Sequence, residues 1–483
     1  MKVAHFFNIA QNGYLNAKIQ RLYTDIEADS YDTGGGETLW HPAWEDALFE
    51  TEQVGDKCWH WGDIQFQEPW QRPAFAKILN FNRGKKGVPW QPAFDTDAEY
   101  SAHLRYIMPM ILEKHAYPLR FNLAQTQKQL LTVSGKDANT VIPDRDYHPF
   151  YLYPFKDLLK KALQESRLSL SEANLIQEKD QYFHYWDSIR EISQNYDLVV
   201  LTGAGAAEGV FLPKEKKVIT FEHSTMRDVL RTTPFSNVAL QLMYQHADQN
   251  IITNGDCQKV AQQMDWKHIF IPHPFDEQKF SPGSSIFKNK IQETYQAKTI
   301  FFCPTRHTNT KSPANKRTDK IIYAFQQYLQ VNPDSLLILV VMGEACHQID
   351  MLCQSLGLGR KVRWMQITPK RKLVELYRAA DIVLDQFGVG SYGTNTIEAL
   401  SCARPVITYV NPDHYAWCQD VLPLPPIHNA QTVEEILGQM FLLTSKDIRE
   451  ESGQKAREWV EKWHSGQRIA KMHQELYEKI LNE

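Results

Sequence analysis

The sequence predicts an α/β protein with two large domains. Three features indicate this class: a length of 483 residues, short apolar runs that end in polar or Gly-rich turns, and helix-like segments between those runs. The clearest unit spans residues 381–410, DIVLDQFGVGSYGTNTIEALSCARPVITYV. There Ile382–Leu384 is a strand-like run, glycines follow, and Thr394–Ser401 has the composition of a helix start.

Composition excludes several other classes of protein. The chain is 43% hydrophobic and 23% charged, with a net charge of -4, so its charge gives no general reason to bind nucleic acid. Its seven cysteines form no CxxC pair, which argues against a zinc site or a disulfide framework and favours a cytoplasmic location. No signal peptide is evident, and the aliphatic run 336–342 is far shorter than the ~20 residues that a membrane span needs. Peripheral membrane association stays open.

The first strand is expected at residues 3–7 and the first helix at residues 15–26. The loop between them holds Asn12 and Gly13, either as part of a binding cleft or as an ordinary turn. From 34 to about 120 the periodic signal weakens, and half of the twelve tryptophans lie there. We expect an irregular insertion, which either recognises an acceptor through aromatic faces or fills a local core. Its tryptophans are Trp40, Trp44, Trp59, Trp61, Trp70 and Trp90.

Residues 154–194 are helical in composition, and strands are expected at 196–201 and Lys217–Phe221. The second of these strands ends at Glu222-His223-Ser224. Ligands bind at the strand ends of open α/β sheets, so His223 is a candidate site residue, and Arg227 follows one helical turn later. A purely structural histidine is the alternative. Pro, Gly and Ser collect near 281–287, which predicts an interdomain linker.

The second domain is expected to begin with a strand at 298–303, followed by Arg306 and a basic loop with Lys311, Lys316 and Arg317. Taken alone, such a loop is typical of a solvated surface. Further elements are expected as a helix at 318–330, strands at 336–342 and 361–365, a helix at 370–380, and a charged helical tail at 447–482.

Gly388, Gly390 and Gly393 form a GxGxxG string, but a dehydrogenase is not the favoured interpretation. This string lies late in the chain, and the next strand carries no acidic residue. Glycines followed by a helix start still suit phosphate, because backbone N–H groups and the helix dipole stabilise an anion there. Glu398, one turn into the helix, is placed to accept hydrogen bonds from ribose hydroxyls.

The segment from Gly390-Ser391-Tyr392-Gly393 through Glu398 to Pro405-Val406 resembles the donor-binding segment of retaining nucleotide-sugar glycosyltransferases with the GT-B fold, family four. That family usually has two glutamates here. Glu398 matches the second, which binds the donor ribose, whereas Gly390 stands where the first would contact the donor sugar. Two family glycines are also replaced, by Arg317 and Ala403.

The resemblance implies two Rossmann-like domains facing across a cleft. The expected divisions are 1–282 for an acceptor-side domain with the Trp-rich insertion, 283–460 for a nucleotide-sugar-binding domain, and 461–483 for a helix that returns to the first domain.

The resemblance also implies roles for single residues. Arg306 and Lys316 would hold the donor diphosphate, with Lys311 as a competitor for the lysine role, and His223 would lie beside the transferred sugar. Backbone groups at Gln366 and Ile367 would contact the nucleobase. The donor segment itself would comprise Gly390, Ser391, Tyr392, Gly393, Thr394 and Glu398, and the acceptor side Asn12, Gly13 and Arg227.

The implied reaction moves a sugar from a nucleotide-diphosphate donor, expected to be a UDP-sugar, to a hydroxyl of a glycan, a lipid-linked or another acceptor, with retention and without a metal. The Asp-x-Asp strings at Asp95 and Asp144 are expected on the solvated surface. An epimerase, a phosphorylase and a non-catalytic glycan- or nucleotide-binding module remain open alternatives.

Overall fold

The computed structural model describes residues 1–34, 38–51, 58, 61–80, 91–105, 155–177, 184–229, 235–308 and 315–483. Its contacts divide the chain into two compact units. The first unit comprises Met1–Thr253, Lys259–Ile271 and Ala470–Glu483, and the second comprises Asn254–Gln258 and Pro272–Ile469. The expected division at 282/283 therefore lies inside the second unit.

The first unit contains an eight-stranded sheet of order β4-β3-β2-β1-β5-β6-β7-β8, which is parallel except for the β3–β4 pair. From β3 to β8 this order is the doubly wound order of Rossmann folds, with its switch point between β1 and β5. The strands are β1 (Lys2–Phe6), β2 (Glu27–Asp32), β3 (Ala76–Leu79), β4 (Ala93–Phe94), β5 (Leu198–Thr202), β6 (Lys217–Phe221), β7 (Gln249–Ile252) and β8 (His268–Phe270).

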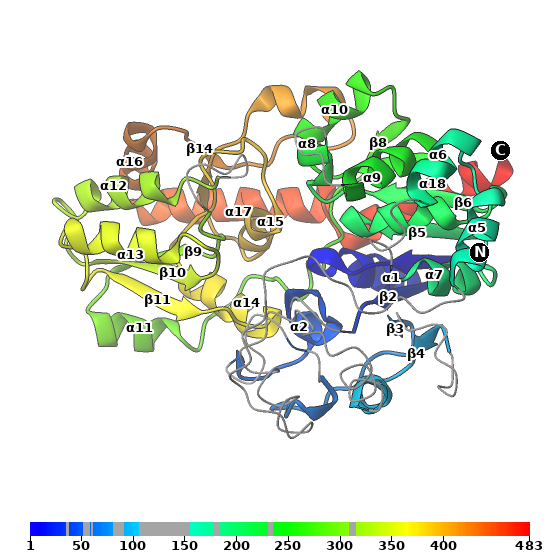
Figure 1. Ribbon diagram of the computed structural model, residues 1–483. Helices are drawn as coiled ribbons and strands as arrows, with labels where there is room; N and C mark the ends of the chain where they lie inside the picture. The colour runs from blue at the N-terminus through cyan, green and yellow to red at the C-terminus, as the bar shows by residue number, and fades with distance from the viewer. Residues whose placement is uncertain are drawn as a thin grey trace. The chain divides into compact units, whose positions relative to one another are not determined.

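Helices connect and cover these strands (Figure 1). They are α1 (Asn12–Tyr23), α2 (Pro42–Asp46), α5 (Phe155–Gln164), α6 (Leu170–Gln177), α7 (Trp186–Ser193), α8 (Thr225–Val229), α9 (Phe235–His246), α10 (Gln258–Gln263) and the 3-10 helix η6 (Gly203–Phe211).

The region expected to be an irregular insertion contributes strands β3 and β4 to the sheet. Just before it, β2 was missed because its sequence, EADSYD, has no apolar alternation. Two of its aspartates are satisfied by partners distant in sequence: Tyr196 donates to Asp29, and Arg72 pairs with Asp32. Of the six tryptophans, Trp44 and Trp61 are buried core residues, whereas Trp59 and Trp90 lie outside the described residues.

The second unit contains a six-stranded, all-parallel sheet of order β11-β10-β9-β12-β13-β14. This is again the doubly wound order, and its switch point lies between β9 and β12. The strands are β9 (Thr299–Cys303), β10 (Ser335–Val341), β11 (Val362–Gln366), β12 (Ile382–Leu384), β13 (Val406–Thr408) and β14 (His428–Asn429). The helices are α11 (Lys288–Tyr295), α12 (Thr318–Tyr328), α13 (Cys346–Ser355), α14 (Lys370–Ala379), α15 (Thr394–Ser401), α16 (Val433–Leu442) and α17 (Lys446–Trp463).

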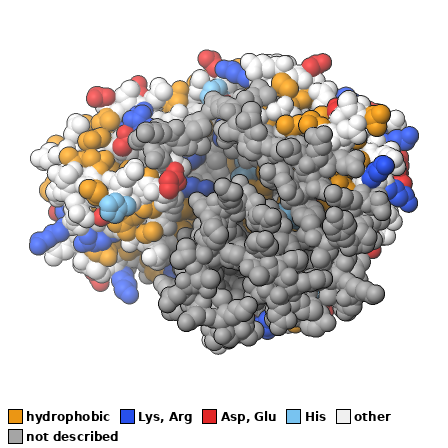
Figure 2. Space-filling view, viewed as in Figure 1, with side chains coloured by type: hydrophobic (Ala, Val, Ile, Leu, Met, Phe, Trp, Pro, Cys, Tyr) orange, Lys and Arg blue, Asp and Glu red, His pale blue; other side chains and the backbone are white. Residues whose placement is uncertain are grey.

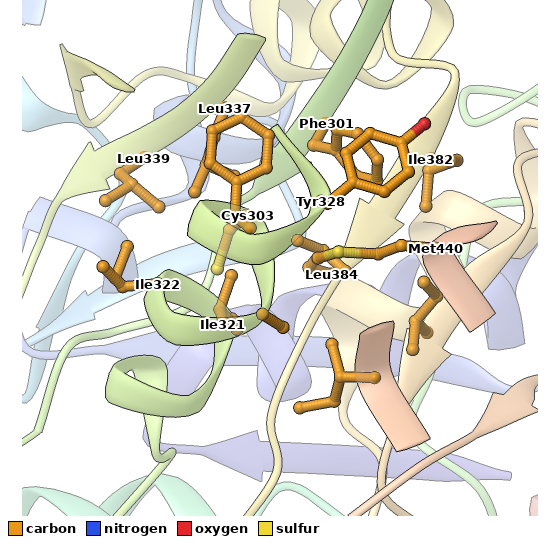
Figure 3. Packing of buried hydrophobic residues seen from close by; sticks show 14 of the residues in the cluster. Phe301, Cys303, Ile321, Ile322, Tyr328, Leu337, Leu339, Ile382, Leu384 and Met440 are labelled. Atoms are coloured by element: carbon orange, nitrogen blue, oxygen red, sulfur yellow. The ribbon is translucent and has the colours of Figure 1, made fainter. Parts of the chain in front are cut away.

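Alternate strand residues of this second sheet face different helices. Phe301 and Leu337 pack against α12, α13 and α16 in one apolar cluster, part of which Figure 3 shows with Ile321 and Ile322 beneath Leu339 and Cys303. On the opposite face Phe302 packs edge-on against Tyr377 of α14, with 5.5 Å between ring centroids. Burying both faces explains why these strands are almost entirely apolar.

The last helix, α18 (Gly466–Asn482), joins the first unit from Ala470 onward. Tyr477 is fully buried, and its hydroxyl accepts from the Gln20 amide at 3.2 Å and pairs with His473 Nδ1 at 3.0 Å. Gln20 Oε1 in turn pairs with His5 Nε2 of β1 at 2.9 Å. A buried polar chain therefore fixes this helix to the first strand and first helix of the sheet.

One face of the molecule shows how charged and apolar side chains are distributed among the described residues. On the face shown in Figure 2, basic and acidic side chains are interspersed with apolar ones. Within the described residues, no helix combines the length and the apolar character that a bilayer crossing requires.

Candidate functional site

In the second unit, the loop after β12 is held open by one buried side chain, Gln386. Its amide nitrogen donates to the carbonyls of Ser391 and Tyr409, both at 2.7 Å, and its Oε1 accepts the backbone N–H of Val389 at 2.8 Å. Gln386 is fully buried, so these bonds are shielded from water. The glycine loop therefore has a fixed shape, set by a residue that the sequence analysis did not single out.

This glycine loop lies directly against the loop that follows β9. The Phe387 N–H donates to the Lys316 carbonyl at 2.9 Å, and a Cβ at Gly388 would overlap the Asn315 carbonyl. Lys320 also donates to the Phe387 carbonyl at 3.1 Å. Because β9 and β12 flank the switch point of the sheet, the two loops meet at the position where open α/β sheets bind ligands.

Helix α15 begins at this same place with an uncapped end. Gly393 is its N-cap residue and makes no side-chain cap hydrogen bond, and a Cβ built on Gly393 would meet no atom within 4 Å. Glycine thus places no side chain at the start of the helix, and the space where its Cβ would lie is open. The partial positive charge of the helix start favours an anion in that space.

Glu398 is buried in the second turn of α15. One carboxylate oxygen pairs with Lys370 Nζ, and the other accepts from the Tyr377 hydroxyl at 2.8 Å. A carboxylate has about four acceptor positions and can therefore serve several donors at once. The predicted ribose contact is compatible with this geometry, and Lys370 is an additional cation at the site that sequence reasoning missed.

The cationic loop after β9 is anchored by a buried histidine. His307 Nε2 donates to the Val340 carbonyl at 2.9 Å and its Nδ1 faces the Thr318 hydroxyl at 3.0 Å, so in the neutral ring the proton lies on Nε2. Burial lowers the pKa of His307 to about 4. Beside it, the Arg306 side chain is exposed and Lys316 is half-buried, while Lys311 lies outside the described residues.

The other predicted donor residues lie near these loops in the fold. Gln366 ends β11 and is exposed, and Ile367 is buried next to it. Ser391 donates to Asp256 at 2.6 Å, and Tyr392 stacks on Tyr415 with 5.0 Å between centroids. Both side chains therefore brace the glycine loop, and the open space remains at Gly393.

Gly390 adopts a left-handed conformation, with φ of 77°. A Cβ there would lie 3.1–3.3 Å from Tyr409, His414 and Asn411. A glutamate at this position would have a strained backbone and a crowded side chain, which explains why glycine stands here.

Two other predicted replacements have the same backbone character. Arg317 and Ala403 have φ of 57° and 55°. Both are positions where the resembling family has glycine, and the left-handed backbone explains that preference.

In the first unit, Asn12 and His223 are in contact although 211 positions separate them. The Asn12 amide donates one N–H to the Ile9 carbonyl at 3.0 Å and the other to His223 Nδ1 at 2.9 Å. Because Nδ1 accepts, the neutral imidazole carries its proton on Nε2. The two residues expected at a site therefore form one unit, with the ring tautomer set by Asn12.

The backbone around this pair is strained. Phe7, Ala10, Gln11 and Ser224 all have positive φ without being glycine. Such conformations cost about 1–3 kcal/mol each and cluster at functional sites. At Gly13 a larger residue does not fit, because a Cβ there would lie 2.7 Å from the Phe7 carbonyl oxygen. Arg227, the remaining predicted residue, lies in α8.

Side-chain amides hold this strained loop against residues 39–41. Gln11 donates to the carbonyls of Leu39 and His41 at 2.6 and 2.8 Å, and Asn8 donates to the Trp40 carbonyl at 2.5 Å. The loop is therefore supported by backbone carbonyls of the Trp-rich region.

His41, whose carbonyl accepts from Gln11, also belongs to a buried ion network that the sequence did not reveal. Arg72 pairs with Asp32 and Asp97, and Asp97 also accepts from His41 Nε2 at 2.7 Å. These charged partners hold the pKa of Asp97 well below its usual range. The expectation that the first Asp-x-Asp string is solvated is wrong for Asp97, which is buried; the second string lies outside the described residues.

Comparison with known proteins identifies part of this architecture. Residues 311–414, which include the glycine loop and α15, match the model of the family described as Glycosyl transferases group 1. The chain contains a group 1 domain. Within the described residues, no cluster of three or more His, Cys, Asp or Glu side chains is arranged to hold a metal ion.

Curated relatives match the chain over a limited stretch. D-inositol 3-phosphate glycosyltransferase of Corynebacterium jeikeium is 28% identical over 148 residues, covering 28% of this chain and 34% of that protein. Mannosylfructose-phosphate synthase of Agrobacterium fabrum is 26% identical over 156 residues, covering 30% and 33%. The matched stretch thus spans about a third of each relative.

Solved structures resemble the chain over a greater length. Sucrose-phosphate synthase from Thermosynechococcus elongatus covers all of this chain and 99% of its own, with a TM-score of 0.54 and 12% identity. Anabaena HepE in complex with UDP-glucose covers 67% of this chain and 94% of its own, with a TM-score of 0.51 and 14% identity. These similarities confirm the predicted α/β fold of the GT-B type.

Proposed function

We propose that the chain is a glycosyltransferase that moves a sugar from a nucleotide diphosphate to an acceptor hydroxyl. The observation that best supports this proposal is the direct contact between the glycine loop at Gly388 and the loop after β9 at Lys316, beside the uncapped start of α15. Glycine backbone, helix dipole and nearby cations are together suited to a diphosphate. The group 1 domain spans these features.

The proposed donor is a UDP-sugar bound by the second unit. Its diphosphate occupies the space before Gly393, its ribose reaches Glu398, and its base lies against the backbone of Gln366 and Ile367. The structural relative HepE has been solved with UDP and glucose and with UDP-glucose, which supports uracil as the base.

The proposed mechanism relies on charge stabilisation. When the sugar departs, negative charge grows on the diphosphate, and Arg306, Lys316 and the α15 N-terminus stabilise that charge more in the transition state than in the ground state. We propose that no metal is needed and that the leaving phosphate assists deprotonation of the acceptor, which retains the anomeric configuration.

For the acceptor side we propose the first unit, at Asn12, Gly13, His223 and Arg227. The acceptor class is a hydroxyl on a glycan, a lipid-linked molecule or a small sugar-like molecule. The Asn12 amide orients the imidazole of His223 through Nδ1, so the proton of the neutral ring lies on Nε2 and has a defined direction.

Donor class is tested by thermal shift against UDP-, GDP-, ADP- and CMP-sugars, with and without magnesium. A ligand that binds only the folded state raises the melting temperature, and we expect this with UDP-sugars, independently of magnesium. Glu398→Ala should abolish the shift, whereas Gly359→Ala should keep it, because nothing lies within 4 Å of a Cβ there. Absence of any nucleotide-dependent shift would contradict the proposal and favour a phosphorylase or a glycan-binding module.

The role of His223 is tested separately. His223→Ala should bind donor normally and lose transfer by about 10²-fold, since it removes one oriented polar group without disturbing the second unit. Transfer is measured as release of UDP in the presence of acceptor. A variant with full transfer rate would refute the assignment.

A further inference from the structure

The space beside Gly390 is occupied by the imidazole of His414. His414 is the last residue of the short 3-10 helix Pro412–His414. Asn411 is the N-cap residue of this helix, and its side chain accepts the Asp413 N–H at 3.1 Å. The Asn411 N–H also donates to the Gly390 carbonyl at 3.0 Å. This turn is therefore fixed to the glycine loop by backbone and side-chain bonds.

The orientation of the His414 ring follows from its own hydrogen bond. His414 Nδ1 lies 3.0 Å from the Gly390 carbonyl, and a carbonyl can only accept, so Nδ1 carries the proton. In the neutral ring Nε2 is then a hydrogen-bond acceptor. Within the described residues Nε2 has no protein partner, and the side chain is partly exposed.

Other polar groups of this loop are already engaged. The Ser391 hydroxyl donates to Asp256, and the Gln386 amide donates to the Ser391 carbonyl. The Tyr409 hydroxyl, whose ring also borders Gly390, is a second group without a partner in the described part of the chain. His414 differs from it in being oriented by the Gly390 carbonyl itself.

We propose that His414 is a specificity-determining residue for the donor sugar, with Nε2 as its hydrogen-bonding atom. This inference rests on the proposed function. In that function, ribose lies at Glu398 and diphosphate at Gly393, so the sugar extends along the loop towards Gly390.

The imidazole of His414 and the carboxylate of a glutamate at position 390 would recognise a sugar differently. A carboxylate at position 390 would accept bonds from two neighbouring sugar hydroxyls, whereas one imidazole nitrogen engages one hydroxyl. Recognition should accordingly depend on a single hydroxyl of the sugar.

Two variants separate recognition from loop structure. In His414→Asn the amide nitrogen takes the place of Nδ1 and keeps the bond to Gly390, while the atom at Nε2 is lost. In His414→Gln the amide takes the place of Nε2 instead. Calorimetric titration of wild type and variants with UDP and with UDP-glucose measures the contribution of the sugar.

We expect His414→Asn to bind UDP within twofold of wild type and UDP-glucose about tenfold more weakly, as one lost hydrogen bond predicts. His414→Gln should recover part of that loss. Equal weakening of both ligands would make His414 a support of the loop and overturn the proposal, as would unchanged UDP-glucose binding. A sugar-specific loss in Tyr409→Phe but not in His414→Asn would move the role to Tyr409 and also overturn it. If wild type binds neither ligand, the proposed function itself fails.

Discussion

Each sheet has a loop beside its switch point that is shaped by different means, after β12 in the second unit and after β1 in the first. In the second unit the loop after β12 is shaped by glycines: Gly388 lets the Asn315 carbonyl approach closely, and Gly390 leaves room for neighbouring side chains. In the first unit the loop after β1 bends through Phe7, Ala10 and Gln11, which are not glycines, and side-chain amides hold it. A glycine loop offers its backbone to a ligand, whereas an amide-held loop aims side chains, here Asn12 at His223.

The largest effect is expected where the glycine loop has no room. Gly388→Ala should reduce UDP affinity more than ~10²-fold, because its Cβ would overlap the Asn315 carbonyl and push the two loops apart. Calorimetric titration with UDP measures the loss. Gly359→Ala is the matched control, since its Cβ would meet open space. Equal UDP affinity in the two variants would show that the close approach is not needed for binding.

Acid should destabilise both units through buried neutral histidines. Burial lowers the pKa of His307 in the second unit to about 4, and that of His5 in the first to about 4. Because both pKa values lie below the unfolded value near 6.5, each residue's stabilising effect is complete above pH 6.5 and is lost as pH falls towards 4.

Each histidine should contribute a loss of about 2 kcal/mol between pH 7.5 and 5. Urea unfolding at a series of pH values measures it, and His307→Gln or His5→Gln should each flatten the profile. If only one substitution flattens it, acid sensitivity resides in one unit and the two sheets differ in this respect as well.

Gln11→Gly tests whether the first loop depends on its side chains. Glycine relieves about 1 kcal/mol of left-handed strain but leaves the Leu39 and His41 carbonyls without their donor, so we expect a net destabilisation of about 2 kcal/mol. The measurement is urea unfolding, with UDP release as a second readout. A stabilised variant would mean that the amide bonds contribute less than the strain.

Arg317→Gly, in the loop after β9 that contacts the glycine loop, tests a left-handed residue of the second unit and should have the smallest effect. It relieves similar strain at φ of 57° and removes only the partly exposed pair with Asp319, so the change in stability should stay within about 0.5 kcal/mol. Unfolding in urea compares it with Gln11→Gly. A loss as large as that of Gln11→Gly would erase the contrast between the loops.

The sequence predicted the second unit better than the first because its elements are local and periodic. The apolar runs at β9, β10 and β12 and the helix Thr394–Ser401 follow from hydrophobic pattern and glycine position. Strand β2 could not be predicted, since Asp29 and Asp32 are compatible with a strand only when Tyr196 and Arg72 satisfy them.

The site residues, like the strands, were predictable where a contiguous pattern marks them and were missed where a contact between distant segments does. Gly393 and Glu398 were singled out from a contiguous pattern, and they lie at the start and in the second turn of α15. Gln386, Lys370 and His414 were missed, because each acts through a contact between segments that the sequence alone does not pair. The contact between Asn12 and His223 likewise joins residues from opposite ends of a long segment, and their proposed roles stay predictions.

The buried chain of Tyr477, Gln20 and His5 has a consequence for biosynthesis. Residues 470–483 complete the core of a unit whose first strand begins at Lys2, and all of Pro272–Ile469 is translated between these two parts. A nascent chain on the ribosome therefore has all strands of the first sheet but lacks the last helix of the first unit while the second sheet is being made. The first unit can be completed only after Pro272–Ile469 has been made, so the second unit can be native before the first.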